Sequence, residues 1–61
     1  EGELSRRTVE NAVRYGITVY DSSYLSLGEI EKMDVYTADQ RLLGKTRDTS
    51  LRPLYRYPLQ E

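Results

Sequence analysis

The fold is decided by the stretch YGITVYDSSYLSLG at residues 15–28, in which Asp21 is the single charged residue. Charged residues make up 31% of the chain, so about four would be expected in a stretch of this length. Thr18, followed three positions later by Asp21, has the pattern of a capping box, with Asp in place of the usual Glu or Gln. We therefore expect a helix over about residues 19–32. Its many small residues would let neighbouring elements approach closely, which predicts a helix packed on more than one side.

Another helix is predicted over about residues 4–15. Apolar side chains recur there at roughly helical spacing among charged ones, which is typical of an amphipathic helix with one buried stripe. That stripe consists of Leu4, Val9, Ala12 and Val13, and Gly16 is well placed as the C-terminal stop. The arginines of this helix are expected to form a solvated face.

The second half of the chain predicts a strand, a short helix and a tail. Residues 34–37 contain an unbroken run of strand formers, as in a buried parallel strand. Asp39 then caps a helix over about residues 40–45. In the tail at residues 46–61, two prolines confine any strand to a sheet edge. Residues 54–57 could form such an edge strand or a tail that lies across another subunit. Since one strand cannot pair its own backbone groups, its partner strands are expected to come from elsewhere.

The composition limits the class of protein. Sixty-one residues allow one small domain with a marginal core, and the chain has no Cys or His to supply a disulfide or a nitrogen-ligated zinc site. The longest apolar run is two residues, which excludes a membrane-spanning helix, and no basic n-region followed by an apolar h-region marks a signal peptide. We therefore expect a soluble, cytoplasmic protein. The chain begins Glu1-Gly2-Glu3 without a Met, and we expect an N-terminal portion to be missing.

The tyrosines and the basic residues have more than one interpretation. The net charge of −1 gives no overall attraction to nucleic acid, so any RNA contact must be local. A candidate for such contact is the set Lys45, Arg47, Arg52 and Arg56, which interleaves with tyrosines suited to base stacking. A solvated tail whose tyrosines pack on the domain explains the same pattern and is preferred. Tyr20 and Tyr24 are expected to belong to the core, and the six tyrosines together suggest half-buried surfaces such as an oligomer interface.

Asp21 and Asp39 are candidates for half of an acidic metal site. Each has a simpler explanation as a helix cap, but caps do not account for the loss of all other charges around Asp21. Mg²⁺ and Mn²⁺ prefer hard oxygen ligands, and an aspartate at the C-terminal end of a strand lies where open parallel sheets bind their ligands. Such ions can activate a water and stabilise the leaving oxygen of a phosphate. Two carboxylates alone are too few for a good site.

Two segments, residues 15–27 and VYTADQRLL at residues 35–43, resemble the C-terminal half of a PIN-domain ribonuclease of the VapC toxin type. In that family a helix opens with Tyr-Asp followed by Tyr-Leu, and a later strand ends in Thr-Ala-Asp before leucines. The match covers about residues 9–43. It implies a three-layer α/β/α domain around a parallel sheet, of which residues 1–61 would be the C-terminal segment.

The resemblance also implies an activity, namely Mg²⁺- or Mn²⁺-dependent hydrolysis of RNA phosphodiester bonds by a toxin–antitoxin protein. Asp21 and Asp39 would be the third and fourth acidic residues of a pocket of about four, with Thr37 as the supporting hydroxyl residue. The family's first aspartate and its glutamate have no counterpart here, so this chain alone is expected to be inactive. The implied partners are an RNA substrate, a missing N-terminal half or sister chain, an antitoxin, and a second copy of the complete domain in a homodimer.

Two other interpretations stay open. The chain could be a non-catalytic helical module that binds a protein partner, with both aspartates acting only as caps. It could also be a degenerate PIN-like protein that is retained for its interactions.

Overall fold

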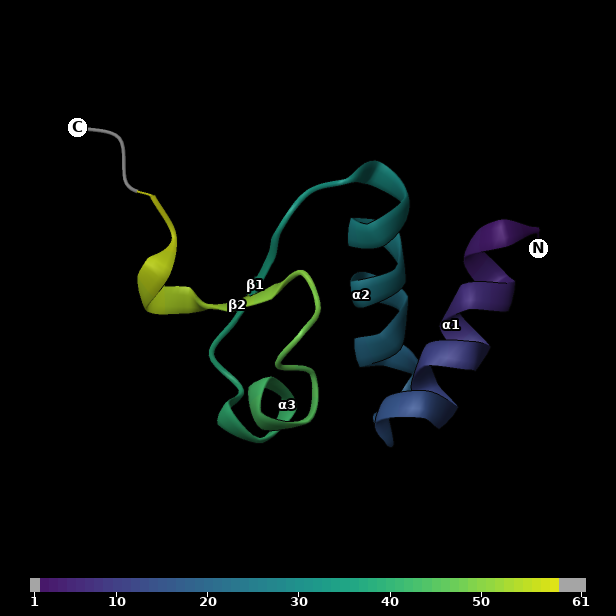
Figure 1. Ribbon diagram of the computed structural model, residues 1–61, viewed down its shortest axis with the longest axis horizontal. Helices are drawn as coiled ribbons and strands as arrows, with labels where there is room; N and C mark the ends of the chain where they lie inside the picture. Colours follow the sequence, from purple (N-terminus) through teal and green to yellow (C-terminus); the bar gives the residue numbers. More distant parts are fainter. Residues whose placement is uncertain (1, 59–61) are drawn as a thin grey trace.

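A computed structural model describes residues 2–58 of the chain as a small α/β fold. The elements in order are α1 (Glu3–Tyr15), α2 (Val19–Glu31), β1 (Val35–Thr37), α3 (Gln40–Lys45), β2 (Leu51–Pro53) and the 3₁₀-helix η1 (Leu54–Arg56). Helices α1 and α2 lie side by side, and the strands and α3 lie on the other side of α2 (Figure 1). Central helix α2 is therefore packed on two sides, as its small residues predicted.

Local capping signals set the ends of the first two helices. Gly16 follows α1 with φ 65° and ψ 42°, a left-handed conformation that glycine adopts without strain, and its N–H donates to the Ala12 carbonyl oxygen. Two residues later the Thr18 hydroxyl accepts a hydrogen bond from the Asp21 N–H at 3.0 Å, which starts α2. The turn between the helices is therefore only Gly16 to Thr18, which holds α1 and α2 close together.

The buried face of α1 is not the predicted one. Val9 and Val13 are 60% and 79% exposed, whereas Thr8 and Asn11 are buried. Asn11 Nδ2 donates to Ser26 Oγ at 2.9 Å and to Glu29 Oε1 at 3.0 Å. Because α2 presents small hydroxyl residues here, the closest fit comes from the polar stripe of α1 and not from its valines. The prediction that the buried stripe of α1 consists of Leu4, Val9, Ala12 and Val13 is therefore wrong.

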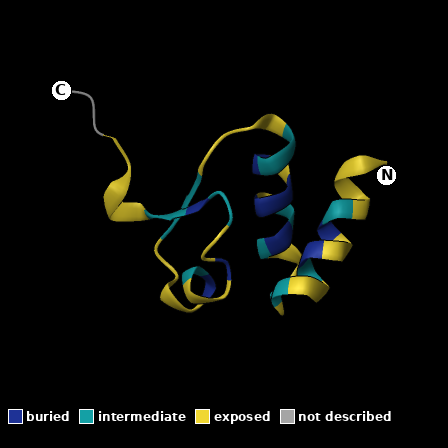
Figure 2. Cartoon of the chain, viewed as in Figure 1, coloured by how far each residue is buried: buried dark blue, intermediate teal, exposed yellow. Residues whose placement is uncertain are grey.

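Apolar packing holds the opposite side of α2. Leu25, Leu42 and Leu51 are 0%, 6% and 4% exposed and join α2, α3 and β2 in one cluster. The burial pattern in Figure 2 places the most deeply buried part of the molecule on α2, between its two neighbours. At Gly28 a Cβ would lie 2.6 Å from Val35 Cγ2, so only glycine allows α2 to approach β1 this closely.

The sheet contains two parallel strands within residues 2–58. Val35 pairs with Leu51, and Thr37 pairs with Pro53. The predicted strand at residues 34–37 thus finds a partner strand in the same chain, contrary to the expectation that all partners come from elsewhere. Residues 54–56 form η1 and not the expected edge strand. Residues 51–53 form the strand because Leu51 is buried in the core. Pro53, which lacks an N–H, lies at the end of β2 on a sheet edge.

The exposed tyrosines correct a further expectation. Tyr20 and Tyr24 are 71% and 49% exposed and are not core residues. The face of α2 that carries them borders an open hollow, which β1, Leu42 and Leu51 also line. The 3₁₀-helix η1 is held differently, because Tyr57 packs edge-on against Tyr36 of β1 with ring centroids 5.1 Å apart. The predicted tail included residues 59–61, which lie outside the described residues.

None of the helices between residues 2 and 58 is long and apolar enough to cross a bilayer.

Candidate functional site

Asp39 and Thr37 flank the turn between β1 and α3. The Asp39 N–H donates to Thr37 Oγ1 at 3.1 Å, and Asp39 Oδ1 accepts from the Leu42 N–H at 3.1 Å. Asp39 is therefore the N-cap of α3, and Thr37 orients its backbone. The second carboxylate oxygen of Asp39 makes no hydrogen bond to any described residue, so it is available for a ligand.

Asp21 lies in the first turn of α2 and is partly buried. Its backbone N–H completes one half of the predicted capping box. The reciprocal bond from the Thr18 N–H to the Asp21 carboxylate is not made within residues 2–58. The cap therefore uses the Thr18 side chain and leaves the Asp21 carboxylate unengaged.

The structure brings these two aspartates into one pocket. Asp21 and Asp39 line a hollow of about 180 Å³ between the start of α2 and α3, although eighteen residues separate them in the chain. Gly16, Ile17 and Thr18 line its other side. Asp21 also borders a second hollow of about 220 Å³, which Thr37 and three tyrosines share. Asp21 and Leu42 line both hollows, and Asp21 is the one of the two that carries a charge.

Two cations share the aspartate pocket, and sequence reasoning missed one of them as a site residue. Arg41 and Lys45 are four positions apart on α3 and line the pocket beside Asp39. Lys45 Nζ donates to the Gly16 carbonyl oxygen at 3.1 Å, so it holds α3 against the α1–α2 turn. Neither cation forms an ion pair with an aspartate within the described part of the chain. The i, i+4 spacing of Arg41 and Lys45 places them on one face of α3, but it does not predict that this face meets Asp21.

The pocket offers the type of ligand that a hard metal ion prefers, but too few such ligands. The two carboxylates offer oxygen ligands, which Mg²⁺ and Mn²⁺ prefer. Among residues 2–58, no group of three or more acidic, His or Cys side chains could hold a metal ion. Any metal bound here would need further ligands from outside this part of the chain.

Tyr20 and Tyr24 form a contacting pair beside Asp21. The Tyr20 and Tyr24 rings meet edge-on with centroids 5.2 Å apart, and their hydroxyl oxygens are 3.4 Å apart. The hydrogen bond with Tyr24 raises the pKa of Tyr20, and the charge of Asp21 adds to the same effect. Deprotonation of Tyr20 is therefore expected at a higher pH than that of an ordinary tyrosine.

Only three of the four basic residues predicted as RNA contacts lie together. Arg47, Arg52 and Arg56 line one groove between α3, β2 and η1, while Lys45 lines the aspartate pocket. The tyrosines of this tail divide as well, since Tyr57 packs on β1 but Tyr55 is 81% exposed. The expectation of packed tyrosines therefore holds for Tyr57 and fails for Tyr55.

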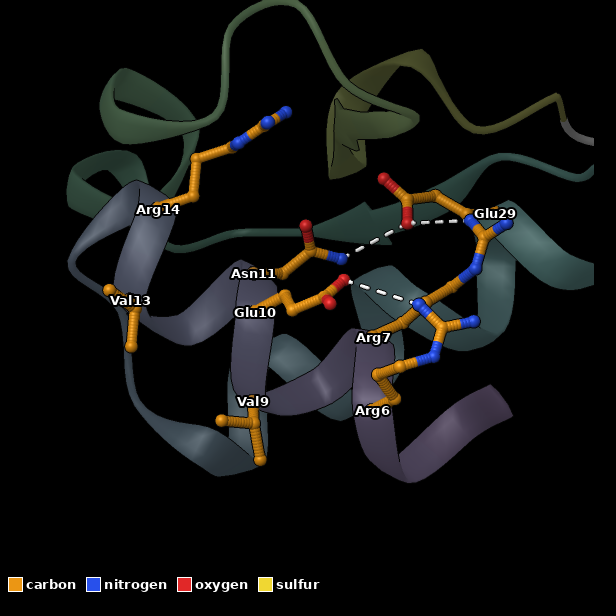
Figure 3. Close-up of a pocket in the computed structure, with 8 residues that line it drawn as sticks. All are labelled: Arg6, Arg7, Val9, Glu10, Asn11, Val13, Arg14 and Glu29. Carbon is orange, nitrogen blue, oxygen red and sulfur yellow. Dashed lines mark hydrogen bonds and ion pairs between the residues drawn. The ribbon is translucent and has the colours of Figure 1, made fainter. Parts of the chain in front are cut away.

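A wider hollow of about 790 Å³ runs along α1 (Figure 3). Asn11 and Arg7 both reach the Glu29 carboxylate across it, with Arg7 Nη1 3.3 Å from Glu29 Oε1. Figure 3 shows Val9 and Val13 pointing away from Glu29. The Arg7–Glu29 pair holds α1 to α2, and Arg6 pairs with Glu10 within α1. Arg14 also lines the hollow but makes no ion pair or side-chain hydrogen bond within residues 2–58.

Comparison with protein families, with curated proteins and with solved structures finds no match to this chain. The resemblance to PIN domains therefore rests on the two sequence segments alone.

Proposed function

We propose that this chain is part of a divalent-metal-dependent endoribonuclease of the PIN type. Asp21 and Asp39 would be two of its acidic ligands, in a three-layer α/β/α domain that other polypeptide completes. One observation carries the proposal, namely that two aspartates from different elements, eighteen residues apart, line the same pocket. Two unrelated helix caps have no reason to meet in this way.

Each residue of the pocket has a role in such a reaction. A bound Mg²⁺ or Mn²⁺ would activate a water and stabilise the leaving oxygen of a phosphodiester. Asp21 and the free oxygen of Asp39 would hold the ion, while Thr37 keeps the Asp39 backbone in place. Arg41 and Lys45 would face the phosphate, where their charges oppose its negative charge.

Within residues 2–58 the site has two carboxylates, so polypeptide outside this part of the chain would supply the others. An N-terminal half of the domain or a sister chain would be that source, and an antitoxin or a second copy of the domain would bind the finished assembly. Without these acids the chain alone binds metal weakly and does not cleave RNA.

A non-catalytic interaction module is the second candidate, and the exposed valines favour it. Val9 and Val13 form an apolar i, i+4 pair on the outer face of α1, where a partner helix would find a contact surface. In this case both aspartates act only as caps, and metal has no effect on the protein.

Manganese separates the two candidates when it is added to the native protein together with any chain that co-purifies with it. We expect Mn²⁺ to raise the thermal unfolding midpoint, and Asp21→Asn and Asp39→Asn each to abolish both that rise and RNA cleavage. Asp39→Asn keeps the N-cap, because Asn caps helices as well as Asp does, so the midpoint without metal should not change.

Asp48→Asn is the matched control, because Asp48 is exposed and does not line the pocket. It should leave the metal response intact. Unchanged cleavage in either Asp21→Asn or Asp39→Asn would contradict the assignment of the site. The intact mass of the native protein would show at the same time whether a second chain supplies the remaining acids.

A further inference from the structure

A second groove, of about 370 Å³, lies on another face of α3 from the aspartate pocket. Arg47, Arg52 and Arg56 line it from the turn after α3, from β2 and from η1. Leu43 and Pro53 add apolar lining, and none of the described residues that line the groove is acidic. This is a local positive surface on a chain whose net charge is −1.

The three arginines differ in how they are held. Arg52 donates through Nη1 to the Leu51 carbonyl at 3.2 Å and to the Thr49 carbonyl, and its Nη2 lies 3.5 Å from Asp34 Oδ1. Arg47 and Arg56 make no ion pair or side-chain hydrogen bond within residues 2–58. Arg52 is thus held in place, and Asp34 partly neutralises its charge. The guanidinium groups of Arg47 and Arg56 are available to an anion.

An aromatic ring is available in the same groove. Tyr55 is 81% exposed and lies next to Arg56 on η1. The position of η1 is fixed, since Tyr57 packs edge-on against Tyr36 of β1. A planar ligand can therefore stack on Tyr55 while its negative groups contact the arginines.

We propose that this groove binds single-stranded RNA, with phosphates at Arg47 and Arg56 and one base stacked on Tyr55. Guanidinium groups for the backbone combined with an exposed ring for a base are how proteins hold single strands. The choice of RNA over DNA rests on the proposed function. Residues of α3 line both the groove and the aspartate pocket, so a strand bound in the groove can continue around α3 toward the two aspartates.

Binding of a fluorescently labelled twelve-nucleotide RNA, measured by anisotropy in EDTA at several salt concentrations, tests the groove without cleavage. We expect the double variant Arg47→Gln/Arg56→Gln to weaken binding about tenfold or more and to reduce the salt slope by about two, since each lost phosphate contact removes about one. Tyr55→Ala should weaken binding about tenfold, while Tyr55→Phe keeps the ring and the affinity.

The control is Arg6→Gln/Arg14→Gln, which changes the net charge equally on α1, where both residues are exposed. An equal loss of affinity in this control would overturn the groove, as would equal binding of duplex RNA. Equal binding of single-stranded DNA would overturn the choice of RNA. Circular dichroism of each variant excludes unfolding.

The proposed metal site and the proposed RNA groove can be contradicted independently of each other. Asp21→Asn and Asp39→Asn should bind RNA normally in EDTA. If they do but cleavage persists, the proposed function is wrong and the groove stands. If Mn²⁺ stabilisation is intact and the arginine pair has no effect on RNA binding, the groove is wrong and the proposed function stands.

Discussion

The two sides of α2 are buried by different means. Toward α1 the contact is polar, because Ser22 and Ser26 are both fully buried and the Ser22 hydroxyl donates to the Thr8 carbonyl at 2.6 Å. Toward the sheet and α3 the contact is apolar, with Leu25 fully buried beside Leu42. The polar side needs specific hydrogen bonds in fixed directions, whereas the apolar side needs volume and close approach.

This difference explains why a single hydrophobic stripe did not identify the buried face of α1. A buried hydroxyl must find a partner, and Asn11 and the Thr8 carbonyl provide partners for Ser26 and Ser22. The valines of α1 have no part in this network and stay exposed.

The largest effect should come from emptying the apolar side. Leu25→Ala removes a fully buried side chain and leaves a cavity, so the free energy of unfolding should fall by about 2–5 kcal/mol. Urea denaturation followed by circular dichroism measures this fall. Val13→Ala is the matched control, because Val13 is 79% exposed, and it should change stability by less than about 0.5 kcal/mol. A large loss in the control would show that Val13 is covered in solution.

Substitutions on the polar side of α2 should lower the free energy of unfolding by less, and their effects should not be additive. Asn11→Ala leaves the buried Ser26 hydroxyl without its donor, which should cost about 1–3 kcal/mol. With Ser26→Ala already present, the same change should cost less, giving a coupling energy of about 0.5–3 kcal/mol in a double-mutant cycle. The same denaturation experiment on the four proteins measures it. Additive losses would mean that the bond between the two side chains contributes nothing.

The smallest effects should come from two glycines with opposite outcomes. At Gly28 a new Cβ would lie 2.6 Å from Val35 Cγ2 and 3.0 Å from the Met33 carbonyl oxygen, so Gly28→Ala should lose about 1 kcal/mol after its gain in helix propensity. At Gly44 nothing lies within 4 Å, so Gly44→Ala should gain about 0.4–1 kcal/mol. Thermal unfolding of both variants measures whether each substitution raises or lowers stability. Stabilisation by Gly28→Ala would show that α2 and β1 are not in close contact.

Local signals predicted where the elements begin and end, but not how the tail pairs. Thr18, Gly16 and Asp39 act on backbone groups within a few positions, so their patterns are readable in the chain. Pairing of β2 with β1 brings together segments about sixteen residues apart through α3, and no local pattern encodes it. The candidate site divides in the same way, because Asp21 and Asp39 were identifiable while the placing of Arg41 and Lys45 beside them was not.

By itself the sequence determined the order and the approximate bounds of three helices and one strand, since caps, glycines and strand-forming runs act over neighbouring residues. Only the tertiary structure decided which stripe of α1 is buried and which segment pairs with β1. It also decided which tyrosines are exposed and which charges share a pocket. The physical reason is that burial depends on the surface a neighbouring element offers, and α2 offers hydroxyl groups to one neighbour and leucine to the others.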